Sequence, residues 1–201
     1  MPPIPPVTKA LILICVAIFF AGQLLPGVLG PIESLTALWP LDSGRFLPWQ
    51  VVSYAFLHGG IGHLFFNMLG LWMFGSELER LWGNRRFLAF LLASVVAAAL
   101  VQLVFTLLVG SRFPTVGASG ALFGLLLAFG MLFPNRVIMP LFPPIPMKAR
   151  TFVMVFGGLE LLFGLSGASG VAHFAHLGGM VGGFLMIRYW RRQPPFGSRR
   201  R

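Results

Sequence analysis

Six apolar stretches, separated by short polar segments, dominate the pattern of this chain. They cover residues 10–29, 61–78, 87–109, 116–133, 152–165 and 171–190. Each approaches the roughly 20 residues that an α-helix needs to cross a bilayer. The fifth is the weakest, because Glu160 interrupts it and residues 164–170 are rich in Gly and Ser; it could begin earlier, near Met147. The pattern predicts an all-α membrane protein with six transmembrane helices.

Composition supports this class, because 57% of the 201 residues are apolar and only 10% are charged. Such a chain has too little polar surface to cover a soluble core. Six helices with short connections leave no room for a second domain, so we expect one domain over residues 1–201, with its core at about 11–190. The start lacks the marks of a cleaved signal or transit peptide, so the first stretch is expected to be retained. The single cysteine, Cys15, is expected only to pack.

Positive charges are unevenly placed along the chain. If the N-terminus is cytoplasmic, thirteen of the fifteen Lys and Arg residues lie in cytoplasmic segments, and only Arg45 and Arg112 lie outside. The positive-inside rule then predicts an N-in, C-in orientation. The basic tail, residues 191–201, is interpreted as a stop-transfer segment attracted to anionic lipid headgroups, not as a nucleic-acid site. A compact chain without added domains or an organellar targeting signal is typical of bacterial membrane proteins. We therefore expect this protein in the bacterial inner membrane.

The outer segment between the first two stretches, about residues 30–60, is too long for a tight turn. It carries Trp39, Phe46, Trp49 and Phe56 with few charges. Aromatic side chains of this kind lie at headgroup depth. The segment is therefore either an interfacial anchor or a partly embedded loop beside a site.

A serine, Ser119, lies at the start of the fourth stretch, between Gly117 and Gly120. Pro114 and Gly117 break the chain ahead of it, so Ser119 is expected in the first turn of a helix, beside unpaired backbone N–H groups. Such groups can hold a developing oxyanion, although small residues there can equally serve close helix packing. Phe123, one turn further on, could stack against a histidine or simply pack.

Two candidate bases, His173 and His176, lie three residues apart in the sixth stretch and so on one side of a helix. An imidazole supplies the base that a serine hydroxyl needs. Gly179 and Gly183 then form a Gly-x-x-x-Gly face that lets this helix approach another closely. The short helix of Ser119 is the expected neighbour.

A second polar pair, His63 and Asn67, lies in the second stretch at a spacing of four residues. The two share one helix face, and in a bilayer such groups usually point into the bundle or a wet cavity. Spacing alone favours a hydrogen-bonding pair that joins helices. His58 lies nearer the interface, and its role stays open.

The patterns His-x-x-x-Asn, Gly-x-Ser-Gly and His-x-x-Gly-x-x-x-Gly, on the second, fourth and sixth stretches, resemble those of the rhomboid family of intramembrane serine proteases. The resemblance covers about residues 11–190. It implies a six-helix bundle with a membrane-embedded first loop, Ser119 as nucleophile and His176 as base. It also implies that His63, Asn67 and the Ser119 backbone N–H hold the oxyanion. The family's first loop usually contains a Trp-Arg pair, whereas Trp49 is followed here by Gln50.

The resemblance also implies a substrate class. A peptide bond in an intact helix is shielded, so cleavage needs local unwinding. We therefore expect single-pass membrane proteins, with small residues at the cleaved bond and Gly, Pro or polar residues just inside the helix.

Other functions are less well supported by the residues. A metal site is not expected, since the chain has one cysteine, few acidic residues and no His-Glu-x-x-His, and no cofactor is predicted. A small transporter would be expected to show an inverted repeat, and none is convincing. A rhomboid-like pseudoprotease that binds membrane helices would lack the serine or the histidine. No carboxylate lies near either in sequence, which favours a Ser-His dyad; Glu160 is read as a structural hydrogen-bonding group that could also orient a histidine.

Overall fold

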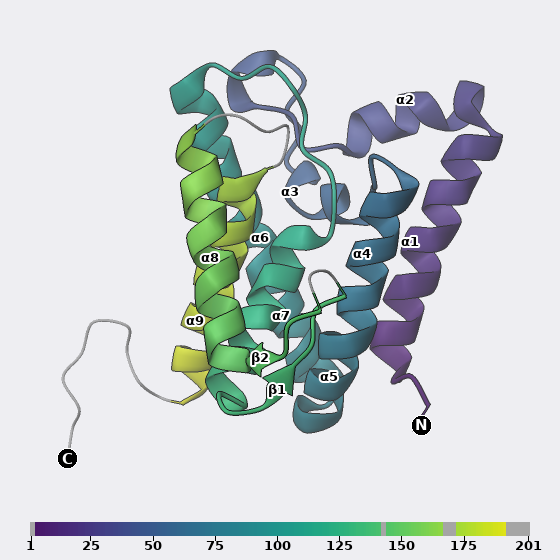
Figure 1. The fold of residues 1–201 in the computed structure, drawn as a ribbon. Helices are drawn as coiled ribbons and strands as arrows, with labels where there is room; N and C mark the ends of the chain where they lie inside the picture. The colour runs from purple at the N-terminus through teal and green to yellow at the C-terminus, as the bar shows by residue number, and fades with distance from the viewer. Residues whose placement is uncertain (1–2, 142–143, 167–171, 192–201) are drawn as a thin grey trace.

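The protein is mostly helical in the computed structural model, which describes residues 3–141, 144–166 and 172–191 (Figure 1). The helices are α1 (Pro6–Leu24), α2 (Pro26–Thr36), α3 (Gln50–Ser53), α4 (Ile61–Gly70), α5 (Ser76–Trp82), α6 (Asn84–Val109), α7 (Ser119–Leu132), α8 (Ala149–Ser166) and α9 (His173–Trp190). Shorter turns are the 3-10 helices η1 (Leu41–Ser43) and η2 (Tyr54–Phe56) and the π-helix η3 (Leu71–Gly75). By length and composition, α1, α6 and α8 are the described helices long and apolar enough to cross a membrane, and α7 is a shorter apolar helix.

The first apolar stretch is divided between two helices, where the sequence pattern predicts one. α1 ends at Leu24, and Pro26 begins α2, which turns away from α1 at the upper end of Figure 1. Proline lacks the N–H and disfavours a helical conformation in the residue before it, and Leu25, just ahead of Pro26, leaves the helical region with φ −129° and ψ 54°. None of the residues of α2 is buried.

The segment that follows α2 is held together by Gln50, whose side chain is fully buried. Its Oε1 accepts a hydrogen bond from the Trp39 N–H at 3.2 Å, and its Nε2 donates to the Leu35 and Arg45 carbonyls at 3.2 and 3.1 Å. The Trp49 indole also donates to the Leu35 carbonyl at 3.0 Å. Gln50 therefore fixes the folding of this loop through backbone groups.

The second apolar stretch forms one continuous helical rod, in which α4, η3 and α5 follow one another without a break. Near its end, the carboxylate of Glu79 accepts hydrogen bonds from the Val7 and Thr8 N–H groups at 2.9 and 2.7 Å, and from Thr8 Oγ1 at 2.7 Å. These N–H groups lie in the first turn of α1 and have no partner inside that helix. A negative charge at a helix N-terminus also complements the helix dipole. Glu79 thereby fastens the start of α1 to the second rod.

Glycines on two adjacent faces of α9 let three helices pack closely. A Cβ on Gly182 would lie 2.6 Å from the Ala93 carbonyl oxygen of α6. A Cβ on Gly179 would lie 1.8 Å from the Gly120 carbonyl oxygen of α7, and one on Gly183 would lie 3.2 Å from the Cα of Gly124. Contacts this short leave no room for a side chain, so backbone packs against backbone.

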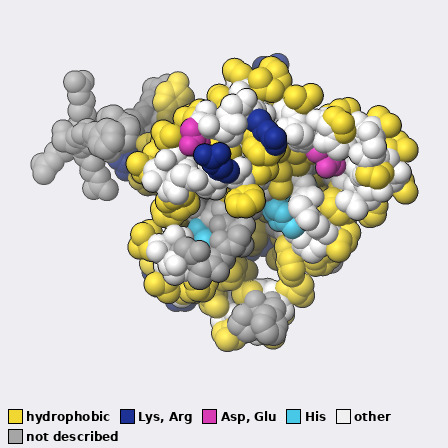
Figure 2. All heavy atoms as spheres, turned by 90° about the horizontal axis from the view of Figure 1, so that it is seen from above, with side chains coloured by type: hydrophobic (Ala, Val, Ile, Leu, Met, Phe, Trp, Pro, Cys, Tyr) yellow, Lys and Arg dark blue, Asp and Glu magenta, His cyan; other side chains and the backbone are white. Residues whose placement is uncertain are grey.

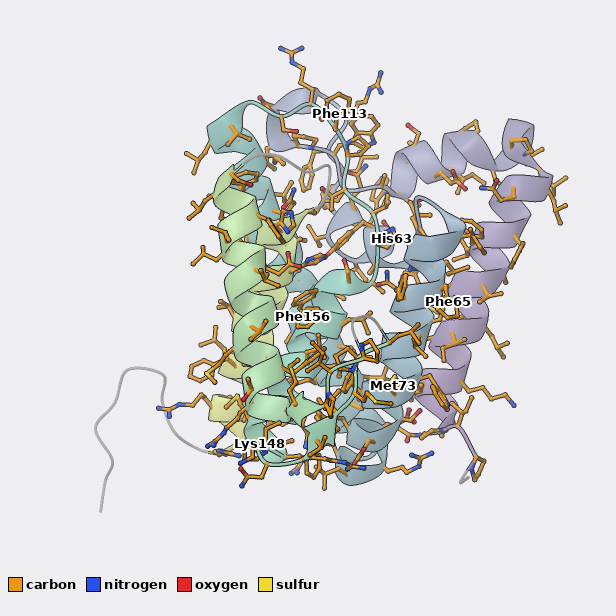
Figure 3. The ribbon with its side chains drawn as sticks, in the orientation of Figure 1. His63, Phe65, Met73, Phe113, Lys148 and Phe156 are labelled. Atoms are coloured by element: carbon orange, nitrogen blue, oxygen red, sulfur yellow. The ribbon has the colours of Figure 1, made fainter. Side chains whose placement is uncertain are left out.

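A short two-stranded ribbon, which the sequence analysis does not predict, lies between α7 and α8. β1 (Val137–Ile138) pairs antiparallel with β2 (Met147–Lys148). Lys148 lies at the opposite end of the molecule from Phe113, which belongs to the segment before Ser119 (Figure 3). The start of α1 and the end of α9 lie at the same end as the ribbon (Figure 1).

Candidate active site

Ser119 is the first residue of α7 and directly follows the segment that connects α6 to α7. The turn before it depends on Gly117, whose φ of +124° is unfavourable for residues with a side chain. The Gly117 N–H donates to the Tyr54 carbonyl at 2.9 Å, which anchors this turn to the first loop. The first N–H groups of α7 are therefore presented beside the serine hydroxyl.

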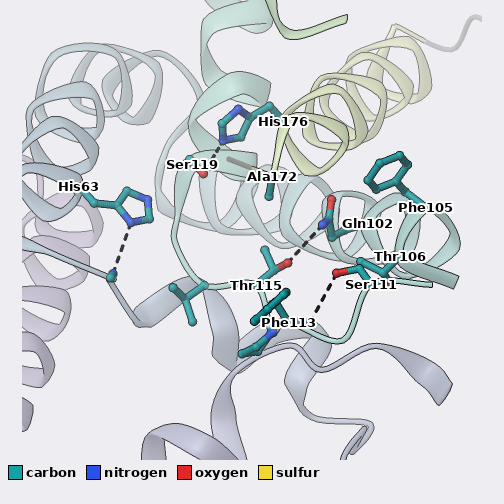
Figure 4. Close-up of a pocket in the computed structure, with 13 residues that line it drawn as sticks. His63, Gln102, Phe105, Thr106, Ser111, Phe113, Thr115, Ser119, Ala172 and His176 are labelled. Carbon is teal, nitrogen blue, oxygen red and sulfur yellow. Dashed lines mark hydrogen bonds between the residues drawn. The ribbon is translucent and has the colours of Figure 1, made fainter. Parts of the chain in front are cut away.

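His176 of α9 lies within hydrogen-bonding distance of this serine: its Nε2 is 2.7 Å from Ser119 Oγ (Figure 4). The ring of Phe123 stacks on the imidazole, with centroids 4.3 Å apart and planes only 8° from parallel. Gly120 and Gly179 bring α7 and α9 together one turn from this contact. The histidine thus has little freedom to move away from the serine.

His63 lies on the other side of Ser119, on α4. A Cβ on Gly117 would lie 2.7 Å from His63 Nε2 and 3.7 Å from Ser119 Oγ, so these atoms surround one small space. His63 Nδ1 accepts from the Gly59 N–H at 3.4 Å, which leaves the ring proton on Nε2, facing the serine. His58 stacks edge-on against His63, and burial together with that histidine lowers the pKa of His58 to about 4, so His58 is neutral at pH 7.

Asn67 lies one turn further down α4 and does not reach the serine. Its Nδ2 donates to the backbone carbonyl of His63 at 2.7 Å, and its Oδ1 has no hydrogen-bond partner in the described part of the chain. The structure therefore brings His63 to Ser119 and His176, but keeps the Asn67 side chain on its own helix.

A cavity of about 800 Å³ opens beside these residues, and His63, Ser119 and His176 all line it. Seen from above, this end of the molecule is covered mainly by hydrophobic and uncharged groups, and histidine side chains are visible on it (Figure 2). Sequence reasoning missed two polar residues of the lining, Gln102 and Thr115, which form a hydrogen bond of 3.3 Å. A glutamine inside the apolar stretch of α6 is the signal that could have found them.

A carboxylate approaches the far side of His176, although the two residues are distant in sequence. Oε2 of Glu160, on α8, lies 2.8 Å from His176 Nδ1 and 2.5 Å from His173 Nδ1. The side chains of Glu160, His173 and His176 are only 13%, 8% and 9% exposed. The contact with His173 has the geometry of a hydrogen bond, whereas His176 Nδ1 makes none in the described part of the chain despite its short distance to the oxygen.

The same three residues are the ones, within the described ranges, whose donor atoms could hold a metal ion. One atom from each lies within 4.8 Å of the others, and two imidazoles with a carboxylate are ligands that Zn²⁺ accepts. The sequence predicts no metal site, and that stays a prediction.

A model of the rhomboid domain matches residues 45–193 of this chain. The chain belongs to the rhomboid family. It is 34% identical to rhomboid protease GluP of Bacillus subtilis over 138 residues, which are 68% of this chain and 25% of that protein. It is 30% identical to rhomboid protease GlpG of Yersinia pestis over 189 residues, which are 92% of this chain and 62% of that protein. The chain thus spans between a quarter and about three fifths of these relatives.

Proposed function

We propose that this rhomboid-family protein is an intramembrane serine endopeptidase with Ser119 as nucleophile and His176 as base. The observation that carries the proposal is the 2.7 Å contact between Ser119 Oγ and His176 Nε2 at the start of α7. A hydroxyl is a weak nucleophile unless a base within this distance takes its proton. The relatives named as rhomboid proteases support the same activity. This contact is a reason to prefer an active enzyme to an inactive helix-binding relative or a transporter.

The reaction proceeds by acyl transfer. Ser119 Oγ attacks the carbonyl carbon of the substrate while its proton moves to His176 Nε2, and the carbonyl oxygen becomes an oxyanion. When the C–N bond breaks, His176 returns the proton to the leaving amine. A water molecule then attacks the acyl-enzyme, with His176 again taking the proton, and releases the acid and Ser119.

The oxyanion is held by the Ser119 N–H and by His63, whose Nε2 proton faces the space beside Ser119. Asn67 acts with them in our proposal. Its Nδ2 donates a hydrogen bond to the His63 carbonyl. To contact the oxyanion, the Asn67 side chain must therefore rotate; otherwise it acts on the oxyanion only by fixing the position of His63. The cavity of about 800 Å³ offers water and the substrate carbonyl a route to these groups.

In the bilayer, six helical spans form the bundle: α1, the α4–η3–α5 rod, α6, α7, α8 and α9. Of these, α7 has only 14 residues and is shorter than a full crossing. The first loop, with α2, lies embedded in the outer leaflet; the exposed apolar side chains of Val28, Ile32 and Leu35 support this. The chain is N-in and C-in, and the site faces the outer side of a bacterial inner membrane. Its substrates are single-pass membrane proteins whose helix unwinds near that side.

The deciding experiment incubates the purified protein with a transmembrane model substrate beside the Ser119→Ala variant. We expect the unaltered protein to cut the substrate near the outer end of its helix and the variant to leave it intact while folding normally. Equal cleavage by both proteins would overturn the proposal.

A further inference from the structure

We propose that Glu160 is a positioning residue for His176, and that His173 holds Glu160 in that role. The proposal deepens the serine-protease function above and rests on it. It replaces the Ser-His dyad favoured by the sequence with a relay of four side chains from α7, α8 and α9.

Short contacts connect the four side chains across the three helices. Ser119 Oγ lies 2.7 Å from His176 Nε2, His176 Nδ1 lies 2.8 Å from Glu160 Oε2, and the same oxygen lies 2.5 Å from His173 Nδ1. The imidazole of His176 therefore has the nucleophile at one nitrogen and a carboxylate at the other.

The carboxylate selects the working tautomer of His176. A neutral imidazole carries one N–H, and an ionised carboxylate can only accept. Beside Glu160 the proton is held on Nδ1, which leaves Nε2 free to accept the proton of Ser119. A neutral side chain such as glutamine can both donate and accept a hydrogen bond. With such a residue in place of Glu160, the His176 proton can lie on Nε2 instead, and the histidine then cannot accept the proton of Ser119. The carboxylate also stabilises the positive charge that His176 gains during attack.

His173 accounts for the presence of a carboxylate here. A lone carboxylate 13% exposed in an apolar bundle is costly, and the His173 N–H supplies a second donor to the oxygen that faces His176. The packing brings the two histidines to α8: a Cβ on Gly164 would lie 3.2 Å from His173 Cβ. The small residue at this position lets α8 approach α9.

A modest rotation of the Glu160 carboxylate brings Oε2 into line with His176 Nδ1. The atoms are already 2.8 Å apart, and the last torsion of a glutamate is soft. Catalytic hydrogen bonds are often poorly aligned until substrate is in place. The proposal therefore asks for a change in direction and not in distance.

The test compares Glu160→Gln with Glu79→Gln, a matched variant of a buried glutamate that fastens α1 and lies outside the site. For Glu160→Gln we expect kcat to fall by at least about tenfold with KM little changed, since tautomer control acts on proton transfer and not on binding. For Glu79→Gln we expect a lower unfolding temperature and an unchanged kcat per folded molecule. An unchanged kcat in folded Glu160→Gln overturns the proposal.

A second measurement needs no variant to fold. The ¹⁵N chemical shifts of His176 in the unaltered protein should report a proton on Nδ1, and a proton mainly on Nε2 overturns the proposal. The proposed function is tested separately by Ser119→Ala and by labelling of Ser119 with a fluorophosphonate. If the unaltered protein neither cuts nor labels, the protease function itself fails. If the unaltered protein cuts the substrate and is labelled, but kcat is unchanged in Glu160→Gln and the His176 proton lies on Nε2, then the protease function stands and only the role of Glu160 fails.

Discussion

At the scale of single residues, the contact between Ser119 and His176 determines what the site can do. As the proposed nucleophile and base they act as one unit, so Ser119→Ala and His176→Ala should each abolish proteolysis, and the double variant should be no worse than either. The measurement is single-turnover cleavage by protein shown to be folded. A double variant much slower than both single variants would mean that the two residues act independently.

His63 and Asn67 share a helix face but differ in what they touch, so their variants should differ. His63→Ala removes a proton that faces the reacting space, and we expect turnover to fall about 10- to 1000-fold, as at other oxyanion sites. Asn67→Ala removes a hydrogen bond within α4, so its effect on turnover should be smaller and its effect on unfolding larger. Steady-state kinetics and thermal unfolding of both variants check this. The reverse order would assign the oxyanion contact to Asn67.

The sequence predicted these residues as candidates but not their contacts. Ser119 could be placed in a first turn because Pro114 and Gly117 precede it. His176 could be chosen over His173 only because the glycines that follow it resemble the rhomboid motif. Glu160 could not be assigned to His176, because their meeting depends on how α8 packs against α9. That packing leaves no periodic signal in the sequence.

At the scale of elements, the α7–α9 contact should be the least tolerant of added volume. In Gly179→Ala the new Cβ would meet the Gly120 carbonyl oxygen at 1.8 Å, and a backbone atom cannot turn aside. We expect a loss of about 1–3 kcal/mol in stability, together with loss of cleavage as His176 moves away from Ser119. Denaturant unfolding and cleavage assays measure both.

Gly158→Ala is the control, since a Cβ there meets nothing within 4 Å. In this helical position alanine should be neutral or stabilising by up to about 1 kcal/mol. If both substitutions cost the same, close backbone packing is not what holds α7 and α9 together.

The apolar pattern located the cores of α6 and α7 to within a few residues, but missed other elements. It overran Pro26, although proline is a stop signal that composition alone does not weigh. It could not show the π-helical turn of η3, since no residue type marks one, or the ribbon of β1 and β2, which has only two residues a strand.

At the scale of the whole molecule, the placement of basic residues leads to a prediction on orientation. If the N-terminus is cytoplasmic, the sequence pattern assigns thirteen of the fifteen Lys and Arg residues to cytoplasmic segments. A reporter fused after Arg201 should therefore behave as cytoplasmic. An enzyme active only outside the cytoplasm, fused at the same point, should be silent; activity there would reverse the orientation.

Substrate choice also belongs to this scale, because a whole helix must reach Ser119. In a model substrate that is cut, replacing Gly or Pro below the cleaved bond by Leu should slow cleavage. Leu favours helix over Pro by up to roughly 3 kcal/mol. Rates at the same bond are compared by mass spectrometry. An undiminished rate for the Leu version would show that unwinding does not control selection.

The hold of Glu79 on α1 has a consequence for biogenesis. The amides of Val7 and Thr8 are synthesised 72 and 71 residues ahead of the carboxylate that receives them. The first turn of α1 therefore cannot gain these acceptors until Glu79 has been synthesised and α5 lies beside it, so the docking of α1 is a late step in the assembly of the bundle.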